Sequence, residues 1–166
     1  GVKQVRKKLR INIPPGVDTG TKLRVSGEGN AGLKGGPSGD LYVFINVKKD
    51  SKLRREGINI YSEISISYLQ AILGDTVLVD TVDGKVELKI PGGTQPNSTL
   101  ILDNKGVPRL GNPVARGTQE VLIKVKLPTR INEEERNLLE KLASHYSIQN
   151  QTTNSGLFSK FFGKDS

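Results

Sequence analysis

The 166-residue sequence contains no cysteine, no methionine and no tryptophan, and only four phenylalanines and four tyrosines. The lack of cysteine excludes disulfides, thiolate nucleophiles and cysteine-rich metal sites from this chain. So few aromatic side chains favour small sheets with aliphatic interiors over one large aromatic core. No run of about 18 apolar residues occurs, so we expect no membrane-spanning helix and no membrane partner.

The charge of the chain is strongly positive, with 25 Lys and Arg against 17 Asp and Glu and a net charge of +8. Such a balance favours acidic partners through long-range attraction. The basic residues, however, are spread along the chain in clusters such as 3–10 and 52–55, with few aromatic residues between them to stack on bases. We interpret them as a solvated face and expect no nucleic-acid partner, and we keep a basic β-rich RNA- or polyanion-binding module as the alternative.

The motifs that could support catalysis lack the neighbouring residues that the chemistry would need. Residues 27–32, "GEGNAG", match G-x-G-x-x-G, but the following "LKGGPSGDLYV" breaks any helix that could hold a pyrophosphate. His145 is the only histidine, and the sequence places no Cys, Asp or Glu at the spacing from it that a catalytic triad or a metal site needs. The sequence therefore predicts neither an enzyme nor a metal or cofactor site.

Two stretches of the chain repeat each other. "IPPGVDTGTKLRVSGEG" runs from Ile13 to Gly29, and "IPGGTQPNSTLILDNKG" runs from Ile90 to Gly106, so that matching residues are 77 positions apart. An internal duplication explains this pattern. The Pro and Gly clusters within it are typical of turns, which shape the fold and do not carry out a reaction.

Alternating apolar and polar residues predict strands around both copies, at residues 8–13 and 39–47 in the first and at 86–90 and 117–125 in the second. The second copy is preceded by a predicted strand at 58–67, a short helix at 68–74 that ends in glycine, and a strand at 76–82 before an Asp-Gly turn. The counterpart of residues 58–82 in the first copy falls almost entirely before Gly1. We therefore expect a fragment of a longer protein whose first domain is incomplete and leaves a sheet edge exposed.

The C-terminal part changes to helical spacing between residues 131 and 146, with Leu138, Leu139 and Leu142 on one side. Asn132 and Glu135 form a capping box at its start. After residue 147 the composition becomes polar, which is typical of a flexible tail. Leu157, Phe158, Phe161 and Phe162 lie between lysines in this tail and form either a weak docking segment or a frayed end.

Two rows of aliphatic residues lie on predicted strand faces: Leu9, Ile11 and Ile13 in the first row, and Leu41, Val43, Ile45 and Val47 in the second. One interpretation is that both rows belong to an ordinary sandwich core. The other is that part of this face stays uncovered and accepts an extended peptide, whose backbone pairs with the sheet edge while its side chain fills a pocket.

Together, "IPPGVDTGTKLRVSGEG", "GPSGDLYVFINV", the stretch from "INIYSEISIS" to "LDNKGVP" and "RGTQEVLIKVKLP" resemble the C-terminal substrate-binding region of DnaJ-type co-chaperones over residues 3–146. The resemblance implies a mostly β fold with two tandem β-sandwich domains. It places an incomplete first domain at residues 1–54, a second domain with a short helix at 55–131, a C-terminal helix at 132–147 and a tail at 148–166. These stretches resemble the cyanobacterial and plant plastid branch of that family most, so we expect the protein in the chloroplast stroma, with the bacterial cytoplasm as the alternative.

In that family, the resemblance implies, unfolded polypeptides bind along the first β-domain and pass to a DnaK-class ATP-driven chaperone. Leu9 and Val43 match the pocket best, followed by Ile11 and Ile45. Homodimers form through the C-terminal end, which makes Leu138, Leu139 and Leu142 candidates for dimerisation. This chain holds neither the His-Pro-Asp motif nor the Cys-x-x-Cys zinc module of the family, so we expect it alone neither to stimulate an ATPase nor to bind zinc.

Overall fold

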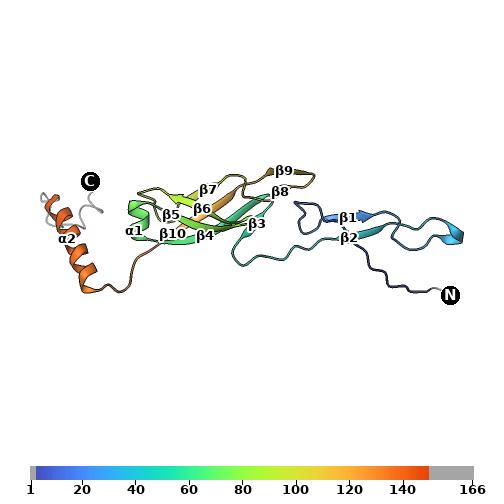
Figure 1. Ribbon diagram of the computed structural model, residues 1–166, viewed down its shortest axis with the longest axis horizontal. Helices are drawn as coiled ribbons and strands as arrows, with labels where there is room; N and C mark the ends of the chain where they lie inside the picture. Colours follow the sequence, from blue (N-terminus) through green and yellow to red (C-terminus); the bar gives the residue numbers. More distant parts are fainter. Residues whose placement is uncertain (1–2, 150–166) are drawn as a thin grey trace, which may run out of the picture. The chain divides into compact units, whose positions relative to one another are not determined.

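The computed structural model describes residues 3–149 and is mostly β, as predicted (Figure 1). The chain divides into two compact units, residues 1–126 and 127–166. The elements of the first unit are β1 (Lys22–Val25), a 3₁₀ turn (Leu33–Gly35), β2 (Leu41–Phe44), β3 (Arg54–Glu56), β4 (Asn59–Ser67), α1 (Tyr68–Leu73), β5 (Asp75–Thr81), β6 (Gly84–Ile90), β7 (Thr99–Leu102), β8 (Pro108–Arg109), β9 (Asn112–Arg116) and β10 (Gln119–Lys126). The second unit contains α2 (Glu133–Gln149).

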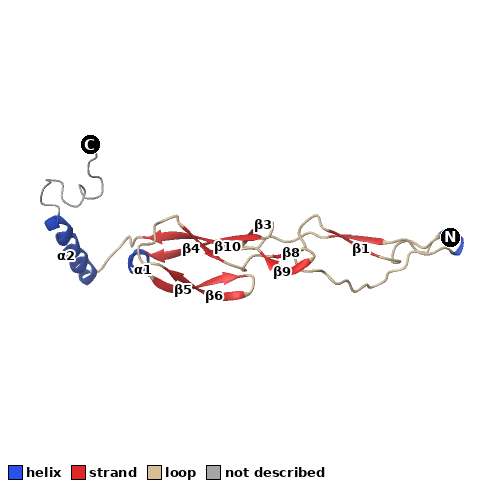
Figure 2. Cartoon of the chain, turned by 90° about the horizontal axis from the view of Figure 1, so that it is seen from above, coloured by secondary structure: helices blue, strands red, loops and turns tan. Residues whose placement is uncertain are grey.

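The second repeat has the only well-buried interior among the described residues. Its main sheet has the order β3-β4-β10-β7, in which β10 runs parallel to β4 and antiparallel to β7. The β5–β6 hairpin forms a separate layer beside this sheet (Figure 2). Between the two layers lie the core side chains Ile66, Ala71, Val79, Leu88, Ile90, Val121 and Ile123, each at most 5% exposed. Burial of these aliphatic groups is what stabilises the second repeat.

The short helix α1 ends at a glycine as the sequence predicts, and a capping box that the sequence analysis did not identify starts it. The Ser67 hydroxyl accepts a hydrogen bond from the Gln70 N–H at 3.1 Å, and the Gln70 side chain accepts one from the Ser67 N–H at 2.8 Å, which completes a capping box. Gly74 ends the helix with a φ of 83°, a conformation that favours glycine. The helix thereby turns the chain from β4 into β5.

The two repeats share the same hairpin register, which confirms the duplication. In the first repeat, β1 pairs antiparallel with β2 so that Val25 faces Leu41 and Lys22 faces Phe44. The counterpart strands of the second repeat are β7 and β10, which pair over Leu102–Thr99 and Gln119–Leu122 at the equivalent positions. Each pair of partners in the first hairpin therefore has its counterpart in the second.

A pair of glycines closes each hairpin in the same way. The Gly29 N–H donates to the Gly39 carbonyl oxygen at 2.8 Å, and the Gly106 N–H donates to the Gly117 carbonyl oxygen at 2.9 Å. In the second repeat an added Cβ on either glycine would clash with the Ile58 carbonyl oxygen, just before β4. The first repeat has no described counterpart of that carbonyl.

The predicted strand at residues 8–13 is absent from the structure. Its counterpart in the second repeat is β6, which is a strand because it pairs with β5 along its whole length. Among the described residues no strand pairs with residues 8–13, and this segment stays irregular. The prediction therefore failed because it considered the strand's own pattern without its partner.

The strand predicted at 39–47 is shortened to Leu41–Phe44 for a related reason. Beyond Phe44, the turn before β1 still holds the chain, since the Ile45 N–H donates to the Thr21 carbonyl oxygen at 2.9 Å. In the second repeat β10 continues to Lys126 because β4 pairs with it in parallel from Ile60 to Ser67. The strands predicted around 58–67, 76–82, 86–90 and 117–125 are all present as β4, β5, β6 and β10.

The C-terminal helix begins as the sequence predicts. The Glu135 N–H donates to the Asn132 side-chain oxygen at 2.8 Å, and the Asn132 N–H contacts the Glu135 carboxylate at 3.4 Å. On this helix Leu138 is 60% exposed and Leu142 is 50% exposed, while Leu139 is half-buried. The tail residues Leu157, Phe158, Phe161 and Phe162 lie outside the described residues, and the domain boundaries drawn from the sequence stay a prediction.

Acidification is expected to weaken the fold. The pKa values of five carboxyl groups are lowered: Asp40, Asp50, Asp75, Asp80 and Asp83. The largest cause is the Gly27 N–H for Asp40, and the hydrogen bond from Arg116 for Asp83. Because their folded pKa values lie below the unfolded values, these groups stabilise the fold above about pH 4 and lose that contribution as the pH falls further.

Urea unfolding at about pH 7, about pH 5 and about pH 3 measures this effect. We expect similar midpoints at the two higher values and a clearly lower midpoint in acid. A midpoint that stays constant down to about pH 3 would contradict the role of these carboxylates.

Candidate functional site

The edge of β2 is open on the side away from β1. The first repeat forms only a two-stranded sheet, β1-β2, in the described residues. Its counterpart β10 carries β7 on one side and β4 on the other. Because the Ile45 N–H points to β1, the alternation of strand hydrogen bonds directs the N–H and C=O groups of Tyr42 and Phe44 to the open edge. Within the described residues these groups have no strand partner, whereas the equivalent groups of β10 pair with β4.

The predicted binding residues lie on the first repeat, but only two of them lie on or beside a strand. Val43 lies in β2 opposite Leu23, and Ile45 follows directly after the strand. Leu9 and Ile11 lie in the irregular segment before the first turn. All four side chains are half-buried, and no side chain of residues 3–57 is fully buried. Leu41 and Val43 on β2 and Ile45 just after it form a half-buried apolar face, and the assignment of the four residues to a pocket stays a prediction.

The opposite face of the same hairpin is aromatic and basic, which the sequence reasoning missed. Tyr42 is 47% exposed and Phe44 is 72% exposed. The Lys22 ammonium lies 4.6 Å from the Tyr42 ring centroid and 5.9 Å from that of Phe44. The pairing of Lys22 with Phe44 across β1 and β2 places these groups together. The alternation along β2 was visible in the sequence, but its register with β1 was not.

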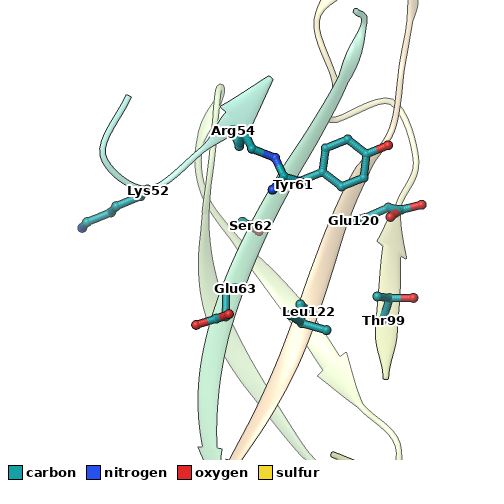
Figure 3. Close-up of a pocket in the computed structure, with 8 residues that line it drawn as sticks. All are labelled: Lys52, Arg54, Tyr61, Ser62, Glu63, Thr99, Glu120 and Leu122. Atoms are coloured by element: carbon teal, nitrogen blue, oxygen red, sulfur yellow. The ribbon is translucent and has the colours of Figure 1, made fainter. Parts of the chain in front are cut away.

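A hollow of about 420 Å³ lies on the outer face of the main sheet of the second repeat (Figure 3). It is lined by Lys52, Arg54, Tyr61, Ser62, Glu63, Thr99, Glu120 and Leu122. The Arg54 guanidinium lies 5.0 Å from the Tyr61 ring centroid, a cation–π distance. Acidic and basic side chains surround the apolar groups of Tyr61 and Leu122. This hollow therefore suits an apolar side chain less well than the apolar face of β2 does. Its residues meet only because β4 pairs in parallel with β10, which local sequence patterns do not reveal.

The described residues contain no group of three or more His, Asp or Glu side chains placed to hold a metal ion. Within the same part of the chain, no helix combines the length and the apolar character needed to cross a membrane.

Comparison with known families gives a match over most of the chain. The family model described as "DnaJ C terminal domain" matches residues 2–128, which include both repeats. This range ends two residues after β10 and before α2.

Similar proteins cover the chain from end to end. A "Chaperone protein DnaJ" of Prochlorococcus marinus subsp. pastoris is 81% identical over 166 residues, which are 100% of this chain and 44% of that protein. Proteins of the same name from another strain of Prochlorococcus marinus and from Nostoc punctiforme are 66% and 57% identical, covering 99% and 98% of this chain and 44% and 43% of those proteins. The chain thus spans less than half the length of these relatives. They are all cyanobacterial, which supports the bacterial alternative and gives no support to a plastid.

Proposed function

Because the chain belongs to the DnaJ C-terminal domain family, we propose that its first repeat binds extended apolar segments of non-native polypeptides. In the longer protein these clients pass to a DnaK-class ATP-driven chaperone. The chain contributes binding and no covalent chemistry, as the chaperone names of its relatives suggest. The bacterial cytoplasm is the compartment that we propose for this activity.

The observation that carries the proposal is the aliphatic face of β2, whose side chains are only half-buried in the described residues. An extended client would pair its backbone with the N–H and C=O groups of Tyr42 and Phe44. Its side chains would cover the face formed by Leu41, Val43 and Ile45. Each buried aliphatic side chain contributes about 1.5–3 kcal/mol, and each backbone hydrogen bond about 1 kcal/mol net. Main-chain pairing of this kind tolerates many client sequences.

Salt dependence separates this function from the alternative of polyanion binding. Binding of a fluorescently labelled unfolded client and of single-stranded RNA can be followed by anisotropy at rising salt concentration. We expect the client affinity to change little, because apolar contacts and backbone pairing hold it. Binding to phosphates would instead weaken steeply with salt. Tight RNA binding with a steep salt slope, together with no client binding, would favour the alternative.

A homodimer through α2 is part of the proposal, supported by the exposure of Leu138 and Leu142. Replacing both leucines with aspartate is expected to convert a dimer to a monomer, since charges in an apolar interface lack partners. Light scattering measures the mass directly. A wild-type chain that is monomeric at high concentration, or a double variant that stays dimeric, would remove this part of the proposal.

A further inference from the structure

A turn of the first repeat is held by an arginine of the second. The Arg55 side chain, on β3, donates from Nη1 to the Val17 carbonyl oxygen at 2.6 Å and from Nη2 to the Gly16 carbonyl oxygen at 3.1 Å. Its Nε donates to the Gly57 carbonyl oxygen at 2.9 Å and lies 3.6 Å from the Asp18 carboxylate. The Arg55 side chain is only 20% exposed. One guanidinium therefore bonds to backbone carbonyls of both repeats.

Gly16 brings the same turn into direct contact with the β8–β9 hairpin. Its φ of 90° favours glycine, and an added Cβ would lie 2.8 Å from the Leu110 nitrogen and still closer to the Pro108 carbonyl oxygen. The counterpart in the second repeat, Gly93, has a similar φ of 84° but no atom within 4 Å of an added Cβ. The repeated turn thus keeps its backbone shape in both copies and makes a close contact with another repeat only in the first.

The turn is also tied to the end of β2. The Gly20 N–H donates to the Ile45 carbonyl oxygen at 3.0 Å, and the Val47 N–H donates to the Thr19 hydroxyl at 2.9 Å. Arg55 and the chain at the end of β2 therefore bind the same turn, at residues 16–17 and 19–20 respectively.

We propose that Arg55, Gly16 and the backbone of residues 108–110 form a fixed joint that sets the orientation of the first repeat relative to the second. Arginine suits this position because its planar guanidinium presents several donors in fixed directions, whereas a lysine ammonium cannot reach the same carbonyls together. The joint goes beyond the proposed function and does not depend on client binding. Only its consequence, that the client-binding face is held at a constant orientation, depends on that function.

Distances between the repeats test the joint. The chain has no cysteine, so Ser26→Cys in the first repeat and Glu87→Cys on β6 give two defined positions for spin labels. Electron–electron double resonance on labelled chain, mixed with an excess of unlabelled chain, measures the distribution of label distances within one molecule. We expect a narrow distribution for the wild-type background. Arg55→Ala and Gly16→Ala should broaden it or shift its centre, and Arg55→Lys should give an intermediate width.

Arg54→Ala is the matched control, because Arg54 neighbours Arg55 on β3 but is 70% exposed and contacts Glu56 and Tyr61. It should keep the wild-type distribution. Circular dichroism and the thermal midpoint of each variant show that the second repeat remains folded. Distributions for Arg55→Ala and Arg55→Lys that superimpose on the wild type would overturn the joint. A broad distribution in the wild type would overturn it as well. Client affinity, measured separately, reports on the proposed function alone.

Discussion

Val43→Asp is expected to weaken client binding by about 10- to 100-fold, which corresponds to about 1.5–3 kcal/mol for the lost burial of one aliphatic side chain. The carboxylate would lie on the apolar face of β2, where the client side chains are proposed to pack. An unpaired charge resists removal from water, so the variant should also lose its ability to suppress the aggregation of a denatured client. Anisotropy with a labelled unfolded client measures the affinity.

Tyr42→Asp is the matched control on the same strand. Tyr42 precedes Val43, points to the opposite face and is 47% exposed. The Tyr42→Asp variant should keep most of its affinity for the client, because its backbone can still pair at the β2 edge. Val43→Thr preserves the shape and the strand preference of valine and should weaken binding only several-fold, which guards against loss of the hairpin in the aspartate variant. Equal client binding by the Asp variants at positions 42 and 43 would contradict the proposal that clients bind to the apolar face of β2.

Gly117→Ala is expected to destabilise the second repeat by about 3 kcal/mol or more, which is at the upper end for overpacking. An added Cβ at Gly117 would lie 2.6 Å from the Ile58 carbonyl carbon and 2.7 Å from the Asn59 side-chain oxygen. These atoms belong to the start of β4, which pairs with β10 along its length. The clash would therefore force apart the central strands of the main sheet. Urea unfolding followed by circular dichroism gives the change.

Gly39→Ala tests the same position in the other repeat. Gly39 corresponds to Gly117, but the nearest atom to an added Cβ is the Asn30 carbonyl oxygen at 3.9 Å. This substitution should change stability by no more than about 0.5 kcal/mol. The difference between the two alanine variants measures how closely Ile58 and Asn59 pack against Gly117. Equal destabilisation at both positions would contradict this difference in packing.

The helix ends and most strands of the second repeat were predictable because their signals are local: the Ser67 and Asn132 caps need only residues three positions away. The repeat was predictable because matching residues, such as Ile13 and Ile90, lie at a constant spacing of 77 positions. The strand predicted at 8–13 was wrong because an alternating segment needs a partner strand, and none pairs with it in the described residues. An alternating apolar and polar pattern therefore forms a strand only where another strand pairs with it.

Contacts between distant segments could not be predicted from the pattern. The hollow around Tyr61 and Leu122 depends on the parallel pairing of β4 and β10, and the contact of Arg55 with Val17 crosses 38 positions. Nothing in the basic cluster at 52–55 distinguishes Arg55, which is 20% exposed, from Arg54, which is 70% exposed. The candidate binding residues were chosen by family resemblance and strand alternation, and the structure adds the open edge beside Val43 and Ile45 without testing their role.

Amide hydrogen exchange of the isotopically labelled chain, with and without an extended apolar peptide, tests most directly whether clients pair with the β2 edge. Strand addition predicts that the peptide slows exchange at the Tyr42 and Phe44 amides, which point to the open edge, and shifts the methyl signals of Val43 and Ile45. Protection confined to the hollow around Tyr61 and Leu122, or to the basic segment at residues 3–10, with unchanged exchange along β2, would contradict the account.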